Sequence, residues 1–172
     1  MILRLFLFAL LTLGSGLLTQ CTGYQLGGSK PSQLNHVKSL YVPTYQNETI
    51  TPRAQVYMTN ATVDQLTTDG TYRIASAKQA DATLRCVVSE IDYNPLRLSR
   101  EDALRPQELS VIATVSYQVI DNNTQEVLLE GTVTNRTNIF VEENLQLART
   151  SALPDLARGI AINLVSRITH GL

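Results

Sequence analysis

Residue types that carry chemistry in proteins are scarce in this chain of 172 residues. It has no Trp, two Cys and two His, at His36 and His170. Two cysteines cannot build a disulfide framework or a Cys-based zinc cluster, and two distant histidines give little material for catalysis or a metal site. Charged residues form only 17% of the chain, and 14 Lys and Arg face 15 Asp and Glu, whereas nucleic-acid binders normally show a basic excess. The composition favours a binding or structural protein over an enzyme and predicts no metal and no nucleic-acid partner.

The first twenty residues have the layout of a secretory signal peptide. Arg4 precedes the apolar run Leu5–Leu13, and Gly14-Ser15-Gly16 interrupts that run. The alternative is a transmembrane anchor, but a helix that spans a bilayer needs about 20 apolar residues. We therefore expect residues 1–20 to be removed on export. Arg4 leaves with them, so that 13 Lys and Arg remain against 15 Asp and Glu.

Cys21 follows this segment directly. The sequence Leu18-Thr19-Gln20-Cys21 resembles a bacterial lipobox, in which the cysteine becomes the new N-terminus and carries a covalent lipid. Leu18 matches the pattern, whereas Gln20 departs from the small residue usual before the cysteine. Cleavage nearby by an ordinary signal peptidase, with Cys21 left as a free thiol, is the alternative. We predict lipidation, because an unpaired exposed cysteine is a liability in an oxidising compartment. Residues 21–36 then form a glycine-rich tether.

Residues 37–172 predict a single domain of alternating strands and helices. Strands are expected over residues 37–42, 72–75, 82–93, 109–120 and 126–137, with a change of phase between Val88 and Ile91 that suggests a bulge. Thr51 is expected to cap a helix that starts at Pro52, and a second helical pattern covers 142–169, kinked or restarted at Pro154. These elements predict an α+β two-layer sandwich, order β-α-β-β-β-β-α. Two helices pack on one face of a mainly antiparallel, mixed sheet of four to five strands.

A polar loop over residues 94–107 is the main candidate binding segment. Arg97, Arg100 and Arg105 lie within nine positions of it and alternate with leucines. Arginine binds phosphate through two parallel hydrogen bonds, and leucines can meet acyl chains. The alternative is an exposed loop whose arginines pair with its own Glu101 and Asp102, which would carry no function.

The remaining candidates are weaker. The turn Tyr45–Thr51 could contact a partner, but Asn47 and Thr51 are more simply explained as turn and cap residues. Cys86 falls on the inward face of a strand, which indicates a buried, inert thiol. His36 and His170 have no acidic or cysteine partner nearby in the sequence and are expected at the surface.

Several short motifs in a fixed order give the chain a family resemblance. They are the Cys21-Thr22-Gly23-Tyr24 start, the turn Val42-Pro43-Thr44-Tyr45-Gln46-Asn47-Glu48-Thr49, and the strand opening Ala80-Asp81-Ala82. In this respect the chain resembles the LPS-assembly lipoprotein family (LptE, formerly RlpB), although Thr22 separates the usual Cys and Gly.

The resemblance implies a protein of the outer membrane, lipid-anchored at its periplasmic face. It would plug a large β-barrel of the LptD type and bind lipopolysaccharide during delivery to the cell surface, with no catalysis and no cofactor beyond the lipid on Cys21. The alternative is an envelope lipoprotein that acts as an adaptor for another periplasmic or cell-wall complex.

Overall fold

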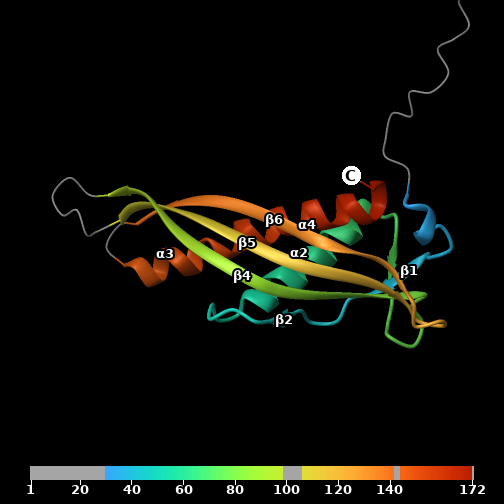
Figure 1. Ribbon diagram of the computed structural model, residues 1–172. Helices are drawn as coiled ribbons and strands as arrows, with labels where there is room; N and C mark the ends of the chain where they lie inside the picture. The colour runs from blue at the N-terminus through green and yellow to red at the C-terminus, as the bar shows by residue number, and fades with distance from the viewer. Residues whose placement is uncertain (1–29, 99–105, 142–143, 172) are drawn as a thin grey trace, which may run out of the picture.

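The computed structural model describes residues 30–98, 106–141 and 144–171, which form one mixed sheet with helices on one face (Figure 1). The sheet order is β3-β1-β4-β5-β6, and β2 pairs with β4 beyond the end of β1. The strands are β1 (Ser39–Tyr41), β2 (Gln46–Asn47), β3 (Arg73–Ile74), β4 (Ala82–Leu98), β5 (Pro106–Asp121) and β6 (Val127–Phe140). The short strands pair in parallel and the three long ones antiparallel, which confirms the predicted α+β sandwich.

The long strands bury one face, as their alternating sequence predicts. Alternate side chains of β5 lie in the core, namely Leu109, Val111, Ala113, Val115, Tyr117 and Val119. The register of β4 against β5 shifts between Val88 and Glu90, and this bulge turns Ile91 and Tyr93 toward the core, as expected.

A second irregularity lies at the start of β6. Leu129 packs against the core, whereas Val127, two residues before it, is 48% exposed. The register of β5 against β6 shifts between Val119 and Ile120. One additional residue in β6 at this point reverses the side on which Val127 lies.

Helices α2 (Ala54–Asp69) and α4 (Leu153–His170) lie side by side on the covered face of the sheet. The apolar stripe of α4 is fully buried and consists of Leu156, Ile160, Leu164 and Ile168. The Tyr72 hydroxyl donates a 2.7 Å hydrogen bond to the backbone carbonyl of Ile168, which fixes the C-terminal end of α4. Pro154 stands in the first turn of α4, after the separate helix α3 (Leu145–Ser151), so the helix restarts there as predicted.

The start of α2 differs from the prediction. Thr51 does not cap the helix, which begins at Ala54 after Arg53, a residue in the left-handed region with φ 64°. The Thr51 hydroxyl instead lies 3.2 Å from the Tyr93 hydroxyl, and the Asn47 side-chain amide donates to the Thr51 carbonyl. The Thr51 hydroxyl, which was expected to cap the helix, therefore makes a tertiary contact with Tyr93 instead. Asn47 does hold the preceding turn, since its side-chain oxygen accepts from the Thr49 backbone N–H and hydroxyl.

The sheet is long enough to separate the two ends of the molecule. The 17 residues of β4 span about 55 Å at roughly 3.3 Å per residue. The first described residues, with the short 3₁₀ helix η1 (Ser32–Leu34), and the turn between β5 and β6 lie at one end. The end of β4, the start of β5, the end of β6 and helix α3 lie at the other (Figure 1).

Candidate functional site

Large apolar side chains are exposed at the end of the molecule far from Lys30. We call this surface the tip and define it as Leu96, Arg97 and Leu98 of β4, Phe140 of β6 and Leu147 of α3. Leu96 and Leu98 are about half exposed, and Phe140 and Leu147 are 72% and 68% exposed. Exposed apolar side chains grouped in this way are typical of an interaction surface. The tip therefore combines exposed apolar side chains with one described cation at the same end of the sheet.

Strand register explains why residues distant in the sequence meet at the tip. Arg97 pairs with Glu108 across β4 and β5, and Glu108 pairs with Phe140 across β5 and β6. The three residues form one row across the sheet, on the face without helices. Arg97 is exposed, and within the described part of the chain no ion pair joins it to Glu108.

Helix α3 is capped by a side chain at its start and joined to β4 by one cation–π contact. The Asn144 side chain accepts hydrogen bonds from the backbone N–H groups of Gln146 and Leu147, at 2.9 and 3.1 Å, and so caps the helix. The Arg149 guanidinium lies 4.8 Å from the centre of the Tyr93 ring on β4, a favourable cation–π distance. The first contact stabilises the start of α3, and the second holds α3 against β4.

The loop expected over residues 94–107 is shorter in the structure. Strand β4 continues to Leu98 and β5 begins at Pro106, so Arg97 belongs to a strand end. The paired part includes Pro95, which lacks a backbone N–H. It fits here because β4 has β5 on one side only at this level, since β2 pairs no further along β4 than Val88.

The other predicted site residues fall elsewhere. Arg100 and Arg105, with Glu101 and Asp102, lie outside the described residues, and so does Cys21. The structure thus shows one of the three arginines, at the tip.

Two tip residues, Phe140 and Leu147, were absent from the sequence-based set of candidates. A signal for Leu147 was present, because it lies off the helical stripe that contains Leu145 and Ala148. Phe140 occupies an outward position in the alternation of β6. Neither signal connects these residues with Arg97, because strand register places Phe140 in its row and the packing of α3 against β4 places Leu147.

The polar groups inside the domain serve structure. Cys86 is buried, as predicted, and burial raises the pKa of its thiol to about 12, which leaves too little thiolate for nucleophilic chemistry. Burial also raises the pKa of Tyr45, whose hydroxyl lies 2.8 Å from that of Thr62. His36 is exposed, as predicted, and its Nε2 atom lies 2.9 Å from the carboxylate of Asp121, a residue distant in the sequence. The pairing of residues so far apart in the sequence comes from the fold.

The described residues show neither a metal-binding cluster nor a helix fit to cross a membrane. Residues 30–98, 106–141 and 144–171 contain no group of three His, Cys, Asp or Glu side chains placed to hold a metal ion. No helix within them has the length and apolar character that crossing a bilayer requires.

Comparison with known families identifies the domain. The family model LptE, described as lipopolysaccharide-assembly, matches residues 37–168. The chain belongs to the LptE family. At family level it is therefore a lipopolysaccharide-assembly lipoprotein of the bacterial envelope, in a family that acts without catalysis and is not known to need a cofactor. A search among curated proteins found no match.

Solved structures with the same fold are distant from this LptE-family chain in sequence. Protein XCC0632 from Xanthomonas campestris has a TM-score of 0.57 at 13% identity, over 81% of this chain and 87% of its own. Uncharacterized lipoprotein B from Nitrosomonas europaea has a TM-score of 0.53 at 14% identity, over 86% and 90%. A minor lipoprotein from Acinetobacter baumannii has a TM-score of 0.50 at 14% identity, over 76% and 91%. At these identities the likeness establishes the fold.

Proposed function

We propose that this LptE-family protein is anchored by a lipid on Cys21 at the periplasmic face of the outer membrane. It plugs and supports a β-barrel translocon of the LptD type, and it binds lipopolysaccharide at the tip while that molecule is delivered to the cell surface. Arg97, Arg100 and Arg105 bind the phosphates, and the exposed tip leucines and Phe140 contact acyl chains.

The observation that carries the proposal is the composition of the tip. Lipopolysaccharide combines phosphates with a dense group of acyl chains, so a surface that binds it needs cations and apolar side chains close together. Arg97 lies in one row with Phe140, and Leu96 and Leu98 flank it in the sequence. Arginine is suited to this role because its guanidinium binds phosphate through two hydrogen bonds and is weakly hydrated.

The arrangement of the two ends also supports the proposal. The described chain begins at Lys30, about the length of β4 away from the tip (Figure 1). A lipid on Cys21 would hold the Lys30 end near the periplasmic face of the membrane. The tip could then reach away from the anchor, toward lipopolysaccharide or into a barrel.

Binding to lipopolysaccharide tests the role of the tip. We expect the triple variant Arg97→Ser, Arg100→Ser, Arg105→Ser to lose most of its affinity for purified lipopolysaccharide while its circular dichroism and unfolding free energy stay unchanged. The matched control is Arg73→Ser, Lys78→Ser, Arg158→Ser, which removes the same charge from exposed positions outside the tip. Equal losses in both variants would assign the effect to net charge, and unchanged binding in the first would remove the arginines from the site.

The partner and the anchor are tested separately. Membranes solubilised under conditions that keep large barrels intact should yield this protein together with a barrel, and recovery with a different envelope complex would favour the adaptor function. Mass spectrometry of the mature N-terminus should show an acylated Cys21. An unmodified N-terminus elsewhere would remove the anchor but leave the tip experiment valid.

A further inference from the structure

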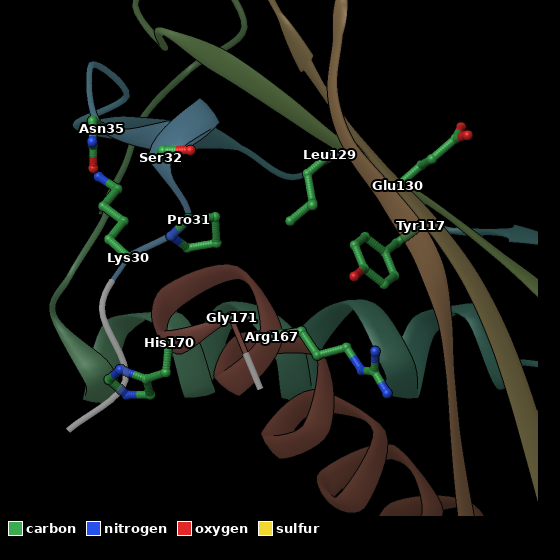
Figure 2. A pocket seen from close by; sticks show the side chains of 10 residues that line it. All are labelled: Lys30, Pro31, Ser32, Asn35, Tyr117, Leu129, Glu130, Arg167, His170 and Gly171. Carbon is green, nitrogen blue, oxygen red and sulfur yellow. The ribbon is translucent and has the colours of Figure 1, made fainter. Parts of the chain in front are cut away.

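A hollow of about 820 Å³ lies at the end of the molecule opposite the tip (Figure 2). The segment around η1, the C-terminal turn of α4 and strands β5 and β6 line this open hollow. Figure 2 shows Leu129 directed into this space and the Tyr117 ring at its side, with Arg167 below. Leu129 is partly buried and packs against the core, and Tyr117 is 4% exposed. The lining is therefore mixed, with Leu129, Pro31 and the edge of the Tyr117 ring among a larger number of polar and charged residues.

The described chain begins at this hollow. Lys30 and Pro31 are among its lining residues. The Lys30 ammonium donates to the Val37 carbonyl and lies 4.3 Å from the centre of the buried Tyr72 ring. These contacts hold the Lys30 side chain against the domain, and since Lys30 lines the hollow, the chain that precedes it starts beside the hollow.

We propose that Tyr24 and Leu26 dock into this hollow, against Leu129 and Tyr117. They are the only large apolar side chains among residues 22–29. An extended chain covers at most about 3.5 Å per residue, so Leu26 lies within about 14 Å of Lys30 and Tyr24 within about 21 Å. Gly27 and Gly28 stand between them and Lys30 and allow the chain to reverse direction at low conformational cost.

The lining suits a short peptide with two apolar side chains. Leu129, Tyr117 and Pro31 offer apolar contact, while Ser32, Asn35 and Glu130 at the rim provide hydrogen-bonding groups for a peptide backbone. The groove continues along β6, because Arg167 also lines the adjoining hollow beside Thr132 and Thr134. This outer side of β6 has no strand partner among the described residues, which suits an extended segment.

Docking would shorten the connection between anchor and domain. From Cys21 to Lys30 a free chain spans up to about 30 Å. With Tyr24 held in the hollow, only the three residues before it remain free, about 10 Å. The domain would then stand at a fixed height above the membrane, with its tip held away from the anchor.

Disulfide trapping in the full-length protein, exported to the periplasm, tests the contact. The variant Leu26→Cys, Leu129→Cys should form an intramolecular disulfide in most molecules, because docking brings the two positions within bonding range. The control Leu26→Cys, Asn123→Cys uses an exposed position in the turn at the same end of the molecule and should form several-fold less. The single variant Leu129→Cys measures any disulfide that the introduced cysteine forms with Cys21. Cys86 does not compete, because it is buried. Equal trapping in both pairs would overturn docking.

Fluorescence gives a second measurement that needs no disulfide. The chain contains no Trp, so Tyr24→Trp places a single reporter in the segment. We expect iodide to quench this Trp several-fold less than a free Trp, and we expect added Leu129→Asp to abolish the protection. Protection that survives Leu129→Asp would place the introduced indole in lipid or detergent and overturn the proposal. Neither readout involves lipopolysaccharide or a barrel, so docking and the proposed function can fail independently.

Discussion

The Asn135 side chain of β6 fills the space over Gly159 of α4 so closely that a methyl group at position 159 would overlap its amide. All three outer atoms of the Asn135 side chain lie within 3 Å of the position that a Cβ would take. The absence of a side chain at Gly159 is therefore what lets α4 approach β6 at this point. The contact helps hold the longest helix of the domain on the sheet.

This relationship predicts that the effect of Gly159→Ala on the free energy of unfolding changes sign when the Asn135 side chain is removed. In the wild-type background the methyl group forces the Asn135 amide aside, and we expect a loss of about 1–3 kcal/mol in the free energy of unfolding. With Asn135→Ala already in place, the overlap is gone, and Gly159→Ala should stabilise the helix by roughly 0.5–1 kcal/mol. Urea denaturation of the four proteins in the cycle measures both values. Equal effects in the two backgrounds would contradict the overlap.

Two carboxylates at the Lys30 end predict sensitivity to acid. The His36 side chain, with the backbone N–H groups of Thr124 and Asn123, holds the pKa of Asp121 below its usual value. Hydrogen bonds from the Lys38 backbone N–H and from Ser39 do the same for the pKa of Asp81.

The direction of these shifts sets the pH window. The unfolded carboxyls titrate near 3.9, so their contribution to stability is complete well above that value and is lost as pH falls through the lower folded-state pKa values. We expect the free energy of unfolding to fall below about pH 4. Asp81→Asn should lower stability at pH 7 and reduce its dependence on acid, as measured by urea unfolding at pH 7 and pH 3. An unchanged pH profile would show that Asp81 does not contribute.

The regular parts of the fold could be predicted because the apolar residues that a strand or helix buries on one face recur at regular intervals in the sequence. Alternation over residues 109–119 identified β5, and the stripe from Leu156 to Ile168 identified α4. The phase change after Val88 even located a bulge. By contrast, the start of α2 was predicted wrongly, because the Thr51 hydroxyl has the distant partner Tyr93 instead of the helix N-terminus.

The candidate site was harder to predict because it depends on register. Arg97 stood out in the sequence, but Phe140 reaches its row only through Glu108 in two strand pairings. Leu147 reaches the tip because α3 packs near Tyr93 through Arg149. No local pattern encodes such relationships between distant positions.

Cys86 should report global unfolding. Burial raises the pKa of its thiol to about 12, and its exposed area is 1%, so the native protein should resist alkylation by iodoacetamide at pH 8. Modification should require unfolding, and its rate should rise with urea in parallel with the unfolded fraction. Mass spectrometry follows the reaction. The variant Lys78→Cys, at an exposed position, is the control that shows the reagent is active on the folded protein. Rapid alkylation of Cys86 without urea would show that the core opens locally.

The apolar part of the tip should be dispensable for folding and needed for binding. Phe140 and Leu147 are 72% and 68% exposed, so changing both to Ser removes little buried area and should alter the free energy of unfolding by less than about 1 kcal/mol. We expect the same change to weaken binding to lipopolysaccharide, because it removes apolar surface beside Arg97 that acyl chains would contact. The control is Val127→Ser, Ile162→Ser, which changes two partly exposed residues outside the tip. Equal affinities for the two double variants, by titration with purified lipopolysaccharide, would assign the ligand to the arginines alone.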